Sequence, residues 1–136
     1  MKTIAICAGI GGFLGVVFGA FGAHAIRDYV DPHLLSVWQT AVQYHLFHCL
    51  VLLVVVAMAV QQPDNRSLRV AGGLFVAGTV LFSGSLYGLV LSGIKLLGMV
   101  TPIGGVLLLA GWLVLSFGLV KFVASGRSMA ERVVGE

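Results

Sequence analysis

The stretch WQTAVQYHLFHCLVLLVVVAMAV occupies residues Trp38–Val60 and contains no aspartate, glutamate, lysine or arginine. About 20 apolar helical residues cross a hydrocarbon core of roughly 30 Å, because each residue of an α-helix adds about 1.5 Å. The stretch is long enough for one crossing and carries no charge that would oppose it. It therefore predicts a membrane-spanning helix.

Three other runs of the chain have the same character. The 136 residues are 59% hydrophobic and only 10% charged, a composition that excludes an ordinary soluble domain. The predicted spans are Thr3–Ile26, Trp38–Val60, Leu68–Ser92 and Thr101–Ala124, which leave only short loops and a tail. We therefore predict an all-α fold class, in which residues 1–136 form one integral membrane four-helix bundle of up-down-up-down topology.

The basic residues are divided unequally between the two sides of this bundle. An even number of spans places both termini on the same side as the loop Gln61–Ser67. That side carries six of the eight basic residues, namely Lys2, Arg66, Arg69, Lys121, Arg127 and Arg132, and the other side carries Arg27 and Lys95. The positive-inside rule predicts cytoplasmic N- and C-termini. The same distribution explains the basic isoelectric point without a nucleic-acid partner.

The N-terminal run has an alternative interpretation. Lys2, the apolar run and Ala23-His24-Ala25 resemble a signal peptide with its cleavage site. The run is longer than the usual apolar region of about 7–15 residues and is rich in glycine. We therefore expect the first span to be retained, and a mature chain beginning at Ile26 would contradict the four-span prediction.

Small residues recur along the first and last spans at helical spacing. Residues four apart lie on one helix face, and small ones let another backbone approach closely in lipid. The predicted helix-packing positions are Gly11, Gly15, Gly19, Gly22, Gly104 and Gly105. They favour packing within the chain, and the same surface pattern is compatible with a homo-oligomer, which we expect.

The second helix has a start signal ahead of its apolar part. Asp31 before Pro32 is typical of an N-cap followed by proline at the first helical position. We therefore predict that this helix begins near Pro32, before it enters the membrane. Thr101 and Pro102 give the last helix a similar start.

Polar side chains gather toward one end of the predicted spans, in the half that faces away from the cytoplasm. Polar groups inside a bilayer are costly, so their clustering suggests a functional site. The candidate ligand-binding residues are His24, Gln43, Tyr44, His45, His48, Ser83, Ser85, Tyr87 and Thr101. We interpret them as an outer-half pocket for a hydrophobic or amphiphilic small molecule or a membrane lipid.

His45 and His48 allow three interpretations. They could hydrogen-bond to hydroxyls of neighbouring helices as packing contacts, line the pocket, or ligate a metal or haem. No carboxylate within a span and no Cys-x-x-Cys pair completes a metal set, and Cys7 and Cys49 suggest free thiols. We therefore predict no metal and no cofactor.

Other functional classes have less support in the sequence. No nucleotide-binding or hydrolase motif is present, so we predict no enzymatic activity and no catalytic residue. A small-solute transporter or channel needs a continuous polar path, but Cys49–Val60 and Leu113–Val120 are almost wholly apolar. That class stays an alternative, as do a metal- or haem-binding protein and an assembly factor for a larger membrane complex.

Four sequence motifs resemble one family. They are Gly19-Ala20-Phe21-Gly22-Ala23-His24-Ala25, Trp38-Gln39-Thr40-Ala41-Val42-Gln43-Tyr44-His45 with His48 beyond it, Leu81-Phe82-Ser83-Gly84-Ser85-Leu86-Tyr87, and Thr101-Pro102-Ile103-Gly104-Gly105. In this order they resemble the family of small membrane proteins that includes YgdD and transmembrane protein 256. The resemblance implies a four-span protein of the bacterial inner membrane and implies no particular activity.

Overall fold

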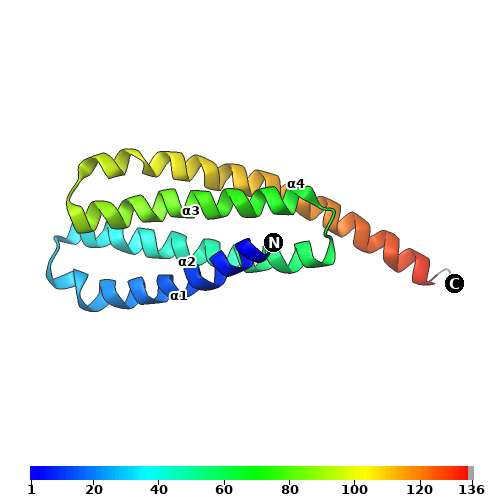
Figure 1. Cartoon of the computed structure of the whole chain (residues 1–136), viewed down its shortest axis with the longest axis horizontal. Coiled ribbons are helices and arrows are strands. Elements are labelled where there is room, and N and C mark those ends of the chain that lie inside the picture. The colour runs from blue at the N-terminus through cyan, green and yellow to red at the C-terminus, as the bar shows by residue number, and fades with distance from the viewer. Residues whose placement is uncertain (135–136) are drawn as a thin grey trace.

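The computed structural model describes the backbone of residues 1–134 and the side chains of residues 1–126, and this part contains helices and no strand. Its four long helices are α1 (Lys2–His24), α2 (Pro32–Gln61), α3 (Arg66–Ser92) and α4 (Thr101–Val134). Each is long and apolar enough to cross a membrane. They run alternately up and down (Figure 1), which confirms the predicted four-span all-α fold. α4 continues as a helix beyond Ala124, the predicted end of the last span.

Local sequence signals explain where the helices begin and end. The backbone N–H of Leu34 donates to Asp31 Oδ1 at 3.0 Å, and Pro32 is the first residue of α2, as predicted. Gly93 ends α3 with a φ of 71°, a left-handed conformation that favours glycine. Two short 3-10 helices, η1 (Ile26–Asp28) and η2 (Lys95–Met99), lie in the connections α1–α2 and α3–α4.

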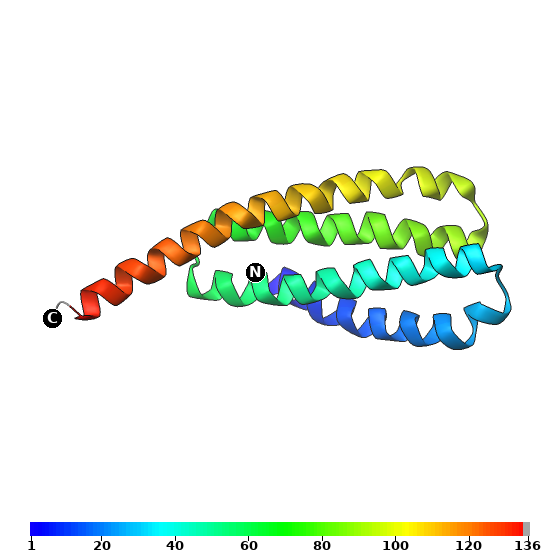
Figure 2. The same cartoon turned by 180° about the vertical axis from the view of Figure 1, so that it is seen from behind.

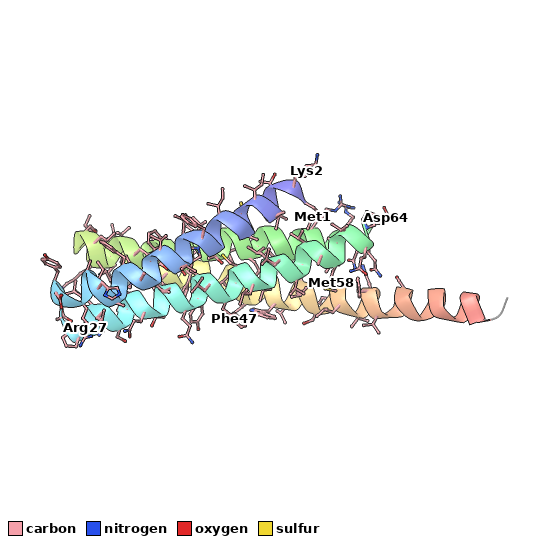
Figure 3. All side chains as sticks on the ribbon, turned by 90° about the horizontal axis from the view of Figure 1, so that it is seen from below. Met1, Lys2, Arg27, Phe47, Met58 and Asp64 are labelled. Carbon is pink, nitrogen blue, oxygen red and sulfur yellow. The ribbon has the colours of Figure 1, made fainter. Side chains whose placement is uncertain are left out.

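The bundle has two distinct ends. Met1, Lys2 and Asp64 lie at one end, and Arg27 lies at the opposite end (Figure 3). We call these the Asn65 end and the Asp31 end, after a residue in the α2–α3 connection and the N-cap of α2. The side chains of Arg127 and Arg132, which were counted in the topology prediction, lie outside the described side chains.

Each helix packs mainly on the next one in the chain. α1 lies along α2, α2 along α3 and α3 along α4, whereas α1 touches α3 only slightly. Figures 1 and 2 show α1 and α4 on opposite sides of the α2–α3 pair. This arrangement accompanies two hollows that side chains of non-consecutive helices line together, one shared by α1 and α3 and the other by α2 and α4.

Two apolar clusters hold the helices together. One is centred on Phe75 and includes buried side chains from all four helices; the other surrounds Trp38 and Tyr87. The indole N–H of Trp38 donates to the carbonyl of Phe18 at 2.9 Å and so connects α2 to α1. Gly22 leaves room for this indole, since a Cβ there would lie 2.5 Å from Trp38 Cδ1.

The other predicted packing glycines differ in how closely they meet a neighbouring helix. A Cβ at Gly11 or Gly15 would meet side chains of α2 at 2.7 and 2.6 Å, whereas at Gly19 the nearest atom is 3.5 Å away. A Cβ at Gly104 would collide with the backbone of Phe82. At Gly105 the nearest atom is 3.8 Å away, an ordinary contact. Close helix approach therefore depends on some of these glycines and not on others.

Side chains of the α2–α3 connection tie it to α4. Asn65 Nδ2 donates to the carbonyl of Gly118 at 3.0 Å, and Gln62 Nε2 donates to the carbonyl of Phe122 at 3.1 Å. Asn65 is buried. These contacts position the Asn65 end of α4 against the turn between α2 and α3.

Candidate functional site

The predicted polar residues do not share one pocket. Six of them line two hollows on different sides of α2, with His45 lining one and His48 the other, and the remaining three line neither. The first hollow, which we call the α1 cavity, lies between α1, α2 and α3. The second, which we call the α2–α4 groove, lies between α2 and α4 with one side chain of α3.

The α1 cavity has a volume of about 360 Å³. The ring nitrogen His45 Nδ1 lies 3.3 Å from the hydroxyl of Tyr87, which is the interhelical contact that the packing interpretation of the histidines expects. Most of the lining is apolar and comes from α1 and α3. Its residues are Ile6, Cys7, Ile10, Gly11, Leu14, Phe18, His45, Cys49, Leu52, Val76, Thr79, Val80, Ser83, Gly84 and Tyr87.

The α2–α4 groove is larger, with a volume of about 600 Å³. Tyr44, Phe47 and Leu109 are among its exposed apolar side chains, so the groove opens on the outer surface of the bundle. Its lining consists of Gln43, Tyr44, Phe47, His48, Phe82, Gly105, Leu108, Leu109 and Trp112. None of these residues carries a formal charge when His48 is neutral.

His48 is the buried polar residue of this groove, only 3% exposed. Its Nδ1 lies 2.7 Å from the backbone carbonyl of Tyr44. A carbonyl oxygen can only accept, so Nδ1 carries the proton, and in a neutral imidazole Nε2 is then an acceptor. Nε2 is buried and has no hydrogen-bond partner. The acceptor Nε2 of His48 therefore lies in apolar surroundings without a hydrogen-bond donor.

Aromatic rings surround this imidazole. The ring centroids of Phe47 and Phe75 lie 5.5 and 5.6 Å from that of His48. The ring of Tyr44 is stacked on it at 5.9 Å, and Trp112 meets it edge-on at 6.4 Å. These rings make the surroundings of the imidazole apolar.

His48 lies near the middle of the long helix α2. His48 is 16 residues beyond Pro32 and 13 residues before Gln61, the two ends of α2. At about 1.5 Å per residue, roughly 20 Å of helix separates it from either end. The imidazole therefore lies near the middle of the bundle, although Gln43 and Tyr44 lie closer to the Asp31 end.

Three of the other predicted site residues line neither hollow, and a fourth lines the groove but is exposed. His24 is exposed at the end of α1 and lines neither hollow. Ser85 and Thr101 bond to each other at 2.8 Å between α3 and α4, and Ser85 also donates to the carbonyl of Phe82. Gln43 is exposed in the lining of the groove.

Sequence reasoning missed the aromatic walls of the groove. Trp112 of α4 was not among the predicted site residues, and in the structure its ring centroid lies 6.0 and 5.5 Å from those of Phe47 and Phe75. The spacing of Tyr44, Phe47 and His48 places them on one side of α2, which is a signal that the sequence does contain. Nothing in the sequence indicated that α4 would provide the opposite wall.

The two cysteines are free, and both line the α1 cavity. Among the residues whose side chains are described, no three His, Cys, Asp or Glu side chains come together as a metal-binding group. His48 could offer Nε2 to a ligand, and His45 is engaged with Tyr87 through Nδ1.

Comparison with known proteins identifies relatives along nearly the whole chain. Residues 18–105 match the family described as protein of unknown function DUF423. The UPF0382 membrane protein YwdK of Bacillus subtilis is 42% identical over 123 residues, which cover 90% of this chain and all of the relative. The UPF0382 membrane protein SAB0533 of Staphylococcus aureus is 43% identical over 122 residues, which cover 90% of this chain and 98% of the relative. No solved structure matches the chain.

These relatives are named membrane proteins, in agreement with the four apolar helices and with the small membrane protein family expected from the motifs. Their names specify no ligand and no reaction. From the match over residues 18–105 and the identity to relatives that the alignment covers almost completely, the chain belongs to the DUF423 family, alongside the UPF0382 membrane proteins.

Proposed function

We propose that this small multi-pass membrane protein binds a lipid-soluble amphiphile in the α2–α4 groove, with His48 as the polar contact. The observation that carries the proposal is the acceptor Nε2 of His48, buried without a donor in the wall of a groove of about 600 Å³. Binding, rather than a reaction, is the function that this arrangement supports.

The energy of the unpaired acceptor supports an occupant. A polar group buried without a hydrogen bond costs about 1–3 kcal/mol, and water that could relieve this cost is scarce at the centre of a bilayer. A molecule that enters from lipid and donates to Nε2 would remove the cost. Tyr44 and Leu109 line the groove and are exposed on the outer surface of the bundle, so such a molecule can enter sideways from the lipid.

The apolar character of both hollows favours this function over solute transport. The lining of the α1 cavity is largely aliphatic, and its paired polar groups are His45 and Tyr87. A polar solute would lose most of its hydration there, and the unpaired hydroxyls of Thr79 and Ser83 would be the main replacement contacts in the α1 cavity. A lipid-soluble molecule loses little hydration when it enters such a hollow from the membrane.

We further propose that the protein resides in the bacterial inner membrane with its Asn65 end in the cytoplasm. The basic residues support this orientation: Lys2, Arg66, Arg69 and Lys121 belong to the Asn65 end, and only Arg27 and Lys95 belong to the Asp31 end. Kinship with YgdD and transmembrane protein 256, which the motifs suggest, is part of the same proposal.

Filling the groove tests the binding function. Leu109 and Leu113 are both on α4 and are 68% and 67% exposed, but only Leu109 lines the groove. We expect Leu109→Trp to displace the bound amphiphile and Leu113→Trp to leave it in place, because only the first indole occupies the groove. Native mass spectrometry of protein extracted with its membrane lipids measures the bound molecules.

Two results would contradict the groove as the binding site. One is the same bound molecule at the same occupancy in both variants. The other is a wild-type protein that carries no small molecule when it is extracted with its lipids. Circular dichroism of both variants provides the folding control.

A further inference from the structure

We propose that the molecule bound in the α2–α4 groove is a neutral, lipid-soluble ring alcohol of the phenol or hydroquinone class, whose O–H donates to His48 Nε2. This inference rests on the binding function proposed above and specifies its ligand. Three features of the groove support it: the protonation of His48, the aromatic walls and the depth.

The protonation of His48 selects for a hydrogen-bond donor. Because the Tyr44 carbonyl accepts from Nδ1 at 2.7 Å, the neutral ring offers only a lone pair at Nε2. An O–H can donate to that lone pair. A quinone, an ester or an ether has only acceptors and gains nothing there, so the reduced and the oxidised forms of one ring would bind with different affinity.

The walls of the groove select for a flat ring. Tyr44 is stacked on Phe82 with ring centroids 4.5 Å apart, and Trp112 lies edge-on to His48 on the α4 side. Aromatic rings pack favourably in offset and edge-to-face arrangements at such distances. The exposed Gln43 amide lies in the same lining and has no intramolecular partner among the described contacts, so it is free to bond a second oxygen across the ring.

The depth of the groove excludes charged headgroups. His48 lies roughly 20 Å of helix from either end of α2, whereas phospholipid headgroups stay at the membrane surface. The lining contains no lysine or arginine that could pair with a phosphate or with a haem propionate. A neutral ring on an apolar tail can reach this depth from the hydrocarbon core.

Trp112 lines the same groove as His48. Its indole is 39% exposed and meets the His48 ring edge-on at 6.4 Å. A ring bound in the groove would therefore lie close to this indole. Binding should therefore change the fluorescence of Trp112.

The experiment compares two probes that differ at their two oxygens, which carry O–H groups in one probe and methyl groups in the other. Decyl-hydroquinone, kept reduced under argon, and its dimethyl ether share the ring and the tail. Their dissociation constants are measured by tryptophan fluorescence with the full chain in lipid nanodiscs. We expect the wild type to bind the hydroquinone about tenfold more tightly than the ether, the effect of one buried hydrogen bond to an otherwise unpaired group.

Two histidine variants test whether the preference for the hydroquinone over the ether depends on His48. His48→Phe keeps a ring of similar size but has no acceptor, so the two probes should bind equally. His45→Phe is the matched control, because His45 lines the α1 cavity and is paired with Tyr87. It should retain the tenfold preference. The wild-type comparison needs no substitution and remains decisive if a variant fails to fold.

The contrary outcomes separate the ligand class from the binding function. Equal affinity of the wild type for both probes, or a preference that survives His48→Phe, overturns the ring-alcohol proposal and leaves the groove as a site. Decanol binding as tightly as the hydroquinone overturns the ring requirement.

A Soret band from haem added to the wild type, absent in His48→Phe, replaces the proposed ligand by haem. Binding of both probes that is unaffected by Leu109→Trp overturns the groove itself.

Discussion

At the scale of single residues, neighbouring positions of the same type have different surroundings. His45 and His48 are three residues apart, yet His45 pairs with a tyrosine hydroxyl and His48 is left with an unpaired nitrogen. Gly104 and Gly105 are adjacent, yet only Gly104 is pressed against the backbone of α3. Such differences depend on the position of a neighbouring helix to within about one ångström.

The two glycines give a prediction at this scale. In Gly104→Ala the new methyl group would collide with the backbone of Phe82, which cannot rotate away as a side chain can. We expect a loss of about 1–3 kcal/mol of stability, typical of an overpacked contact. Gly105→Ala has room, and alanine favours a helix over glycine by about 0.5–1 kcal/mol, so we expect no loss or a small gain.

Thermal unfolding of both variants in one detergent, followed by circular dichroism, measures these changes. Equal melting temperatures for the two variants would show that α3 and α4 do not approach as closely as described. The sequence marked both glycines as packing positions and could not distinguish them, because glycine spacing contains no information on which neighbour is closest.

At the scale of helices, the sequence predicted most of what the structure shows. The number of spans follows from the length of apolar chain that a bilayer requires, and the start of α2 follows from Asp31 and Pro32. The α2–α4 groove could not be predicted, because contacts between helices that are distant in the chain leave no periodic signal. The sequence predicted one cluster of polar residues, whereas in the structure those on α2 line two separate hollows, His45 in one and His48 in the other.

The α2–α3 connection gives a prediction at the helix scale. Asn65→Ala removes the bond to the Gly118 carbonyl, one of the two side-chain bonds between this connection and α4 among the residues with described side chains. We expect a loss of about 1 kcal/mol and faster hydrogen exchange in α4 near Gly118. Asp64→Ala is the matched control, because Asp64 is adjacent and exposed.

Thermal unfolding and hydrogen exchange read by mass spectrometry test this difference. If Asp64→Ala and Asn65→Ala had the same effect, the contact between Asn65 and α4 would contribute nothing measurable. An unchanged exchange rate around Gly118 would lead to the same conclusion.

At the scale of the whole molecule, orientation in the membrane can be tested directly. Asp64 and the 86% exposed Tyr29 lie in connections at opposite ends of the bundle. With Cys7 and Cys49 replaced by alanine, single cysteines at these positions would react from opposite sides. We expect a membrane-impermeant maleimide to label Tyr29→Cys in intact cells, and Asp64→Cys only after the inner membrane is opened, because basic residues favour the cytoplasm at the Asn65 end. The reverse pattern would invert the proposed topology.

The packing of each helix on its predecessor also affects how the chain assembles. When α2 leaves the ribosome, α1 is already in the membrane to receive it, and α3 and α4 each find a completed partner in turn. Contacts between segments close in sequence form quickly, since little chain entropy is lost in bringing them together. The first helix and the last lie on opposite sides of the bundle (Figure 2), so the early stages of assembly do not depend on the end of synthesis. The fold can therefore grow one helix at a time, in the order of translation.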